Sequence, residues 1–518
     1  MNVTRPSLLR SRSLALATAL ALALGACGTQ VVNPVTGQTE RTYMDERAEI
    51  AEGAKGHQEV LKAYSVVADP AVQAYVNALG QKLAAQSHRK ELKWTFTVLD
   101  SDEVNAFALP GGYVYVTRGI MAYLDSEADL AGVVGHEIGH VTARHGAQRA
   151  TRQQNASMAV LGAVVLGSIF GVGQTAGELG QTIAAGHIAK YGREQELQAD
   201  ELGAQYLARV RFNPTNMVDV IQVLKDQERF AADAARAAGR AAPEGGGWLA
   251  SHPSNDQRLA AIRGIAQRLA ATPGTAAWDD EGRARYLKAI DGITFGDSRE
   301  QGVVRGRQFF HEPLAITLTA PQGWRIGNEA EQLVLMSGAG DAALVMKLIP
   351  DEVVKKVGSS DPQALLRALG ASDGRFEAVP LAGGLHATHF SGQRRNAQGQ
   401  VSALEATVAS GPAGRMFLLQ WLARDAQAMQ RSRAALREAE SSFRPMTAGD
   451  RTLARPWRVK VVPMPAGGFA QLARSSPITE LPEQQLRLLN GAYHGEGPAG
   501  SSAAAPDPKP GQLVKVIE

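Results

Sequence analysis

The chain has 518 residues, enough for several domains, and its 44% hydrophobic and 20% charged content is ordinary for globular protein. A formal net charge of +3 is too small and too spread to indicate nucleic acid as a partner. The single cysteine excludes a disulfide within the chain and a thiolate metal site. Histidine and carboxylate side chains therefore remain as the candidate metal ligands.

The first 27 residues have the features of a secretory signal. A basic stretch precedes an apolar run from Leu14 to Leu24, which is short for a membrane-spanning helix. The run ends in Leu-Gly-Ala-Cys, which resembles the processing site of bacterial lipoproteins and implies a lipid on Cys27. The alternatives are an uncleaved anchor or an ordinary signal. Because Gly28 rather than aspartate follows the cysteine, the resemblance implies periplasmic anchoring at the outer membrane of a Gram-negative bacterium.

Helices and then short strands are predicted after a turn-rich tether at residues 28–45. Apolar spacing indicates helices over about residues 45–85, and alternation indicates strands at residues 94–99, 105–109 and 113–116. The strand at Asn105, Ala106 and Phe107 precedes the most distinctive helix of the chain. It is placed to bind an extended peptide by adding it to a sheet edge, and the alternative is a plain structural strand.

That helix contains Gly-His-Glu-Ile-Gly-His at residues 135–140. Ser126 and Asp129 read as a capping box, and apolar residues then recur at helical spacing. Histidines four positions apart project from the same face, so His136 and His140 can reach one zinc ion. Glu137 points about 100° further round the helix, where its carboxylate can take a proton from a zinc-bound water. The alternative is a buried helix that carries two histidines by chance.

Two features that follow this helix have less decisive patterns. His145 lies five positions beyond His140, which favours a structural or supporting role over zinc binding. Residues 156–177 carry no charge and are interrupted by glycines. We expect a hairpin or flap over the active-site side there, with a membrane-dipping segment as the alternative.

A second charged helix at residues 191–200 offers the third ligand. Glu196 is the candidate, and Asp200, four residues further on, can orient a ligand histidine. Spacing alone does not choose Glu196 over Glu194 or Glu201.

His-Glu-Ile-Gly-His followed by Arg-x-x-Glu-x-x-Ala-Asp resembles the gluzincin family of the CAAX-prenyl endopeptidases and HtpX, in its periplasmic lipoprotein branch. The resemblance spans about residues 33–272 and also rests on Asn-Pro-Val-Thr-Gly, Asn-Ala-Phe-Ala-x-Pro-Gly-Gly and Ser251-His252-Pro253 with Arg258. It implies that Glu196 is the ligand and Asp200 the supporting aspartate of one zinc ion per chain. It also implies that His252 lies near the metal, as a fourth ligand or a transition-state donor. A structural histidine is the alternative.

The rest of the chain is predicted to be a mixed α and β structure without a catalytic constellation. A sheet with two helices, opened by Pro-x-Gly-Trp, resembles the PsbP-like α/β fold, and His386, His389 and Glu405 read there as scattered polar residues. The last segment reads as strand–helix–helix–strand and resembles a LysM-like module. That resemblance implies peptidoglycan binding, but the Gly-Asp-Thr turn is missing, which favours a structural module.

The predicted fold class is therefore multidomain α+β, with a mainly helical zincin protease domain carrying a small sheet. The predicted segments are a signal peptide at 1–27, a tether at 28–45, the metallopeptidase at 46–272, a linker at 273–302, the PsbP-like domain at 303–447 and the LysM-like module at 456–518.

The sequence predicts a zinc endopeptidase of the cell envelope. By resemblance, its expected substrates are misfolded or misassembled envelope proteins. A competing hypothesis is an assembly factor or chaperone whose zinc site is latent or structural, and a third is a membrane-embedded protease that rests on residues 156–177.

Overall fold

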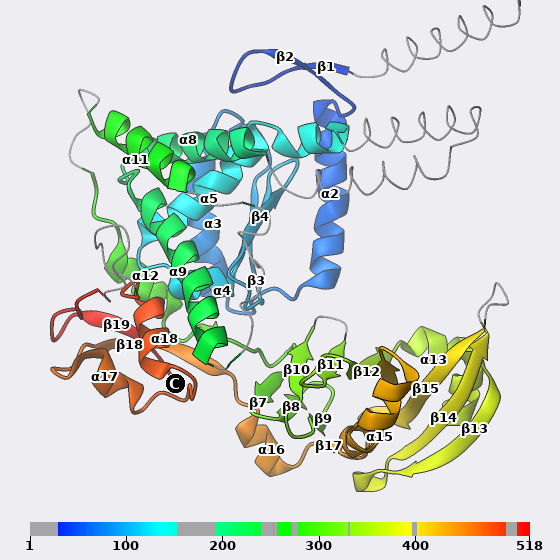
Figure 1. Ribbon diagram of the computed structural model, residues 1–518. Helices are drawn as coiled ribbons and strands as arrows, with labels where there is room; N and C mark the ends of the chain where they lie inside the picture. The colour runs from blue at the N-terminus through cyan, green and yellow to red at the C-terminus, as the bar shows by residue number, and fades with distance from the viewer. Residues whose placement is uncertain are drawn as a thin grey trace, which may run out of the picture. The chain divides into compact units, whose positions relative to one another are not determined.

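The structure is a computed structural model, and it groups the chain into two compact units (Figure 1). Unit 1 comprises residues 66–291 and 459–518 together with the N-terminal part up to residue 62, and unit 2 comprises residues 292–458 with 63–65. The six-segment division predicted from the sequence stays a prediction. Cys27 and residues 156–177 lie outside the described residues, which are 29–152, 192–237, 239, 252, 256–271, 278–329, 332–395, 401–493 and 505–518.

Unit 1 is mainly helical and contains a three-stranded sheet in the order β3-β5-β4, in which β3 is parallel and β4 antiparallel to β5. The predicted short strands are present, and so is helix within the predicted stretch of about residues 45–85. The sheet is β3 (Thr95–Leu99), β4 (Ala106–Leu109) and β5 (Tyr113–Thr117). The other elements described between residues 29 and 291 are β1 (Thr29–Val32), β2 (Thr39–Thr42), α2 (Glu46–Ala63), α3 (Pro70–Ala84), α4 (Arg118–Tyr123), α5 (Glu127–Thr142), α8 (Arg193–Arg209), α9 (Asn216–Ala237), α11 (Asp256–Ala270) and α12 (Arg283–Ile290).

Helix α5 is the centre of unit 1, and every residue from Ala128 to Thr142 is buried. The predicted capping box begins it, because Ser126 accepts from the amide of Asp129 and the Asp129 carboxylate accepts from the amide of Ser126. Asn216 at the start of α9 donates to Asp129 at 2.8 Å. Burial raises the pKa of Asp129 to about 6.

Helix α8 packs closely against α5 because small residues line the contact. A Cβ on Gly139 would lie 2.8 Å from the carbonyl oxygen of Ala199, and one on Gly135 would lie 3.4 Å from the Cα of Gly203. The glycines of the Gly-His-Glu-Ile-Gly-His sequence therefore let the backbone of α8 approach the two histidines.

A buried ionic cluster holds the C-terminal end of α5. The Glu49 carboxylate on α2 accepts from Arg89 and from Arg144, both at 2.8 Å, and Arg89 also donates to the carbonyl of Val141 at 3.2 Å. Arg144 has a left-handed backbone with φ of 60°, a strained conformation for a residue with a side chain. Its pairing with Glu49 stabilises the turn that leads from the metal helix to His145.

The C-terminal segment belongs to unit 1 and supports the turn before α5. The buried amine of Lys515 donates to the carbonyls of Ala122 at 3.0 Å and Leu124 at 2.5 Å, and burial lowers the pKa of Lys515 to about 8. Gln485 donates to the hydroxyl of Tyr123 at 3.0 Å. The predicted strand–helix–helix–strand pattern is present, as β18 (Trp457–Pro463), α17 (Gly468–Ala473), α18 (Pro482–Leu489) and β19 (Leu513–Ile517). Its LysM-like identity stays a prediction.

Helix α12 falls within the segment predicted as a linker. It packs on α3 and α5, and the buried hydroxyl of Tyr286 donates to the carbonyl of Met121 at 2.5 Å. This part of the segment is therefore helix joined to unit 1.

Unit 2 is built on a seven-stranded antiparallel sheet with the order β10-β11-β12-β16-β15-β14-β13, and a four-stranded sheet with the order β17-β9-β8-β7. Helix α15 packs on β12 and β16, over a core that includes Leu344, Trp421 and Leu436. Its strands are β6 (Thr294–Phe295), β7 (Val303–Arg305), β8 (Gln308–His311), β9 (Ile316–Thr319), β10 (Arg325–Asn328), β11 (Leu333–Met336), β12 (Ala342–Ile349), β13 (Ala371–Pro380), β14 (His386–Arg395), β15 (Val401–Ser410), β16 (Met416–Ala423) and β17 (Arg444–Pro445). Its α-helices are α13 (Asp351–Val357), α14 (Pro362–Ala368), α15 (Ala426–Ser441) and α16 (Ala448–Leu453).

The fold is thus a mixed α+β arrangement of several parts, as predicted. Among the described residues, no helix is both long and apolar enough to cross a bilayer.

Candidate metal centre

Two imidazoles on α5 meet at the centre of the candidate site. The helical spacing places His136 and His140 on one face, with their Nε2 atoms 3.0 Å apart and both side chains almost fully buried. Glu137 is 1% exposed and lies between them in sequence. The two imidazoles therefore face one point, as the spacing of this motif predicts.

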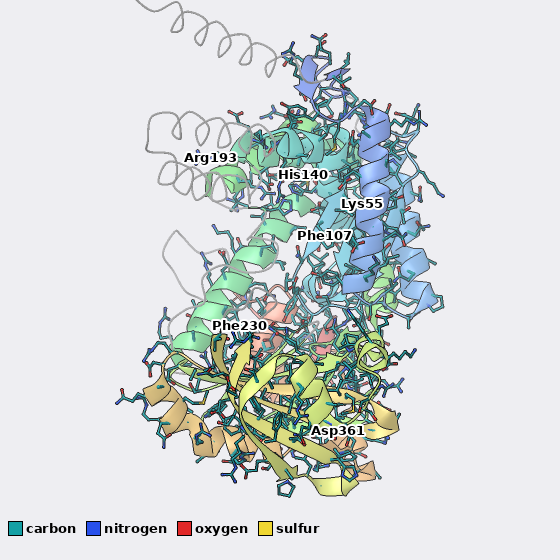
Figure 2. The ribbon with its side chains drawn as sticks, turned by 90° about the vertical axis from the view of Figure 1, so that its right-hand side faces the viewer. Lys55, Phe107, His140, Arg193, Phe230 and Asp361 are labelled. Atoms are coloured by element: carbon teal, nitrogen blue, oxygen red, sulfur yellow. The ribbon has the colours of Figure 1, made fainter. Side chains whose placement is uncertain are left out.

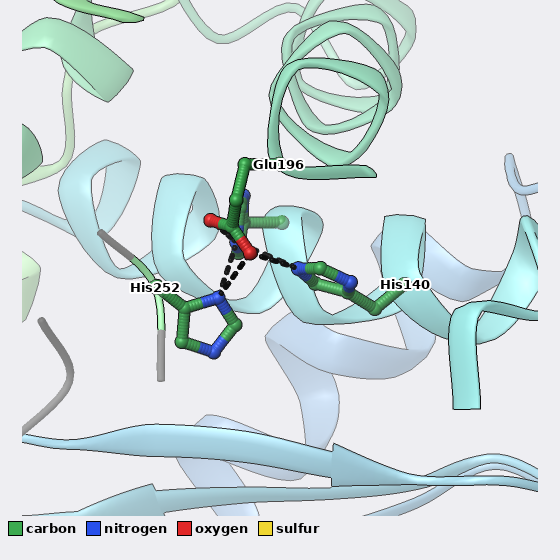
Figure 3. A group of neighbouring side chains, drawn as sticks. His140, Glu196 and His252 are labelled. Carbon is green, nitrogen blue, oxygen red and sulfur yellow. Dashed lines mark hydrogen bonds and ion pairs between the residues drawn. The ribbon is translucent and has the colours of Figure 1, made fainter. Parts of the chain in front are cut away.

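Glu196 reaches the same point from α8. Its Oε1 lies 3.4 Å from Nε2 of His140 and its Oε2 lies 3.6 Å from Nε2 of His136. His252 completes the group, with Nδ1 at 2.9 Å from Oε1 of Glu196 (Figure 3). One ligand atom from each of these four buried residues lies within 4.8 Å of all the others.

His136 has a charged support. Its Nδ1 lies 2.8 Å from Oδ1 of Asp200, and the Arg258 guanidinium on α11 holds the Asp200 carboxylate through two contacts of 2.6 and 2.8 Å. Burial opposes ionisation of Asp200, but Arg258 outweighs it, so the pKa of this carboxyl lies below its ordinary value. Arg258 also lies 2.9 Å from Oε2 of Glu196. The ionised Asp200 accepts the Nδ1 proton of His136, which directs the lone pair on Nε2 at the centre.

His140 has an uncharged support. Its Nδ1 faces Nδ1 of His145 at 2.9 Å, and Nε2 of His145 faces the amide oxygen of Gln198 at 2.9 Å. Burial lowers the pKa of His145 to about 4 and that of His140 well below its ordinary value, so both imidazoles are neutral.

The donor set fits a zinc ion. The Glu196 carboxylate lies 2.9 Å from the Arg258 guanidinium, which favours its ionised form, and the oxygens of an ionised carboxylate can only accept. The Nε2 atoms of His136 and His140 also present lone pairs, so acceptors converge on one point and repel one another unless a cation lies among them. Imidazole nitrogens with one carboxylate are the ligand set of catalytic zinc.

The other residues predicted for the site lie around this group. Glu194 and Glu201, the alternatives to Glu196, are exposed to solvent. Glu137 is not one of the four clustered residues, and its Oε1 lies 3.7 Å from Nε2 of His252. Ala106 and Phe107 lie on β4, the end strand of its sheet, and Asn105 directly precedes that strand.

Helix α2 borders the aromatic side of this strand (Figure 2). Phe107 stacks on Tyr115 with ring centroids 4.7 Å apart, and the hydroxyl of Tyr115 lies 2.6 Å from Nδ1 of His57 on α2. The β4 strand also packs against α5. The predicted peptide-binding strand and the metal helix are therefore neighbours in unit 1.

Sequence reasoning assigned supporting roles to Asp200 and His145 but missed the partners of both, Arg258 and Gln198. The family resemblance included Arg258 but predicted no partner for it. No motif or spacing in the sequence singled out Gln198. Only the fold, which brings the turn after α5 against α8, could reveal that Gln198 contacts His145.

A helix bearing His-Glu-x-x-His, with a carboxylate from a second helix, defines a metallopeptidase centre of the gluzincin type. The comparison with protein families agrees, because residues 70–266 match peptidase family M48. The chain is therefore similar to this family over that stretch, which lies within unit 1.

Among curated proteins, the chain is similar to beta-barrel assembly-enhancing proteases. It is 32% identical to the one from Yersinia pestis over 41% of this chain and 43% of that protein, and 32% identical to the one from Escherichia coli K12 over 39% and 41%. It is 31% identical to the mitochondrial metalloendopeptidase OMA1 of Arabidopsis thaliana over 34% of this chain and 32% of that protein. The chain therefore spans less than half the length of the relatives it matches.

A solved structure, cyanobacterial PsbP from Synechocystis sp. PCC 6803, is 12% identical, covers 29% of this chain and 98% of that chain, and has a TM-score of 0.18. This score does not indicate a shared fold, and the PsbP-like identity of unit 2 stays a prediction.

Proposed function

We propose that the chain is a zinc-dependent endopeptidase of the bacterial cell envelope. The observation that carries the proposal is the position of Glu137. Its buried carboxylate lies beside the convergent group of His136, His140, Glu196 and His252 but is not part of it. A structural metal site does not need such a carboxylate, whereas peptide hydrolysis needs a base at that place.

His136, His140 and Glu196 would hold the zinc ion, which when bound supplies Lewis-acid polarisation of a scissile carbonyl and acidifies a water molecule. Glu137 accepts the proton of the attacking water and delivers it to the leaving amine. Asp200 keeps the His136 ring in the orientation that presents Nε2.

The substrate would bind as an extended strand along β4. An end strand presents backbone donors and acceptors on its outer side, and an added peptide pairs with them whatever its sequence. Asn105, Ala106 and Phe107 would hold the substrate backbone, next to the helix that carries Glu137. Such backbone recognition suits unfolded segments of many proteins.

His252 is proposed as the ligand that keeps the enzyme latent. With four protein ligands the zinc would have no position for water, as in structural sites. Displacement of His252 by substrate or a partner would open that position and free the imidazole to donate to the transition state.

The cellular setting is proposed from the N-terminal signal and the relatives. Lipidation of Cys27 would anchor the protein to the outer membrane, facing the periplasm. The bacterial relatives are beta-barrel assembly-enhancing proteases, and this activity supports misfolded or misassembled envelope proteins as substrates. A contact of the C-terminal segment with peptidoglycan is a further proposal.

The test compares wild-type protein lacking residues 1–27 with Glu137→Gln and His252→Ala. Both variants and wild type should bind one zinc ion per chain. Glu137→Gln should lower casein cleavage by about 10²–10⁴-fold, because general acid–base catalysis contributes that much. His252→Ala should cleave casein faster than wild type. Glu194→Gln, an exposed carboxylate on α8, is the control and should match wild type.

The second candidate is an assembly factor or chaperone with a structural zinc site. The placement of His252 among the ligands favours it, because four protein ligands are typical of structural zinc. If all variants bind zinc and neither wild type nor His252→Ala cleaves casein, the protease proposal is wrong and this candidate replaces it.

A further inference from the structure

We propose that His145 and Gln198 form a relay that fixes the tautomer of His140, so that its Nε2 presents a lone pair to the metal. The relay rests on the proposed zinc site and adds two positioning residues to it. Neither residue is among the four that could hold the ion.

The relay is a succession of two contacts that joins the half-buried side chain of Gln198 to the buried rings of His145 and His140. Gln198 on α8 places its amide oxygen 2.9 Å from Nε2 of His145, which is fully buried. On the other side of the ring, Nδ1 of His145 lies 2.9 Å from Nδ1 of His140. Both distances are those of hydrogen bonds, so each contact contains one proton.

The direction of the relay follows from what each atom can do. An amide oxygen only accepts, so Nε2 of His145 carries the proton of the first contact. The ring nitrogens of His145 face an amide and an imidazole, both uncharged, so the buried ring stays neutral and its Nδ1 is an acceptor. His140 must then donate from Nδ1, and its Nε2 is left without a proton.

The reversed relay would prevent metal binding. If an amide N–H of position 198 donated to His145, the His145 ring would donate to His140, whose proton would move to Nε2. That proton would point at the metal position. An acceptor at position 198 is therefore the feature that selects the binding tautomer.

Helix α8 thus carries the Glu196 ligand and the orienting groups of both histidines, Gln198 for His140 and Asp200 for His136. The short contact of Gly139 with Ala199 sets how close this helix lies. A change in α8 would act on all three ligands together.

The experiment measures zinc affinity by competition with a chelator, in protein lacking residues 1–27. Gln198→Met keeps the length of the side chain without an acceptor, and His145→Phe keeps the ring without the relay. Both should bind zinc about 10–100-fold more weakly than wild type, the usual effect of losing such a support. Gln198→Glu keeps an acceptor that cannot donate and should retain wild-type affinity. The control is Gln205→Met, a half-buried glutamine on the same helix.

A second readout does not depend on zinc. In metal-free protein with ¹⁵N-labelled histidine, long-range ¹⁵N–¹H spectra report which ring nitrogen carries the proton. His140 should be protonated at Nδ1 in wild type and Gln198→Glu, and should become a mixture of tautomers in Gln198→Met. A change in folding alone would alter Gln198→Met and Gln198→Glu equally.

The outcomes separate the relay from the function that it supports. Tight zinc binding by wild type together with unchanged affinity in Gln198→Met and His145→Phe overturns the relay and leaves the protease proposal standing. Equal weakening in Gln198→Glu and Gln198→Met also overturns it. Wild type that binds no zinc overturns the proposed function and the relay with it.

Discussion

The two units each contain a buried histidine cluster, and the clusters differ in how their charges are balanced. In unit 1 the ring nitrogens of His136 and His140 face each other and a carboxylate. In unit 2 the ring of His389 lies between two carboxylates, with Nε2 at 3.0 Å from Glu405 and Nδ1 at 3.1 Å from Glu440. The unit 1 cluster needs a bound cation to balance its acceptors. In the unit 2 cluster, the protonated ring of His389 can itself be the cation that balances the two carboxylates.

The unit 2 cluster is closed by arginines. Arg433 lies 2.8 Å from Glu405 and Arg437 lies 2.5 Å from Glu440, and both guanidinium groups lie over the ring of Trp421. Thr407 donates a short hydrogen bond to Glu440. The carboxylates are therefore met by cations of the chain itself. Helix α15 carries both arginines and Glu440, so the cluster joins this helix to the sheet.

The difference teaches that clustered histidine and glutamate do not by themselves indicate a metal. What decides is whether each acceptor faces a donor. In unit 2 both nitrogens of His389 face carboxylates, so a protonated ring satisfies all of them. In unit 1 acceptors converge on one point. A metal is expected in unit 1, whereas the unit 2 cluster is held together by ion pairs within the chain. We call this group of His389, Glu405, Glu440, Arg433 and Arg437 the ionic staple.

The largest expected effect breaks the staple. Glu440→Gln removes a fully buried charge and leaves His389 and Arg437 without it, and breaking a buried ion pair costs about 3–5 kcal/mol. Hydrogen exchange of peptides from β14, β15 and α15 should therefore become much faster. Zinc affinity and casein cleavage should stay at the wild-type level.

Glu438→Gln is the matched control, because Glu438 is exposed on the same helix. If Glu440→Gln exchanges no faster than this control, the staple contributes nothing to unit 2. If Glu440→Gln lowers zinc affinity, the separation of the two clusters is wrong.

The next effect comes from zinc removal, which should act on unit 1 alone. A ligand at 100 times its dissociation constant stabilises the state that binds it by about 2.7 kcal/mol. Chelation should therefore speed hydrogen exchange in α5 and α8, the two helices that carry the proposed ligands. Peptides of unit 2 should be unaffected.

Glu137→Gln sharpens this prediction, since it keeps the ligands and should show the same response to chelation. His140→Ala should show no response, because it lacks a ligand. Equal acceleration in both units on chelation would mean that the metal stabilises the whole chain rather than the cluster.

The sequence was most informative where local patterns determine the structure. The capping box at Ser126 and Asp129 is present, and so are the predicted strands at β3, β4 and β5. Helical spacing was enough to place His136 and His140 on one face. The choice of Glu196 needed the family resemblance, because three glutamates fitted the spacing equally well.

Contacts between distant segments could not be predicted. Gln198 and His145 are 53 residues apart, and His389 and Glu440 are 51 residues apart. The sequence pattern predicts that His389 and Glu405 are scattered polar residues, and this is wrong, because pairing between β14 and β15 brings them within 3.0 Å in the folded sheet. Periodicity shows which face a residue occupies, but not which residue faces it from another element.

The smallest expected effect is the change in the stability of unit 2 with pH. It tests the ionic staple at high pH, through His389, and at low pH, through Glu405. Burial opposes the charge on His389, but Glu405 and Glu440 outweigh it and raise its pKa above the ordinary 6.5. Stability from a raised pKa is complete below 6.5 and is lost as pH rises through the higher value. Burial also opposes ionisation of Glu405, but His389 and Arg433 lower its pKa to about 2 from the ordinary 4.5. That contribution is complete above 4.5 and is lost as pH falls toward 2.

Unit 2 should therefore be most stable between about pH 4.5 and 6.5, and hydrogen exchange of α15, corrected for the intrinsic rate at each pH, measures this window. His389→Gln keeps a polar side chain but cannot be protonated, so the loss of stability at high pH should disappear in this variant. If the decline persists, His389 is not its origin. Because His389 and Glu405 contact each other, the substitution should also shift the acid limb to higher pH, toward the ordinary value for glutamate. If the arginines alone balanced the charge of Glu405, His389→Gln would lose stability at the same low pH as wild type. A loss that begins at higher pH in His389→Gln would instead show that protonated His389 balances this charge.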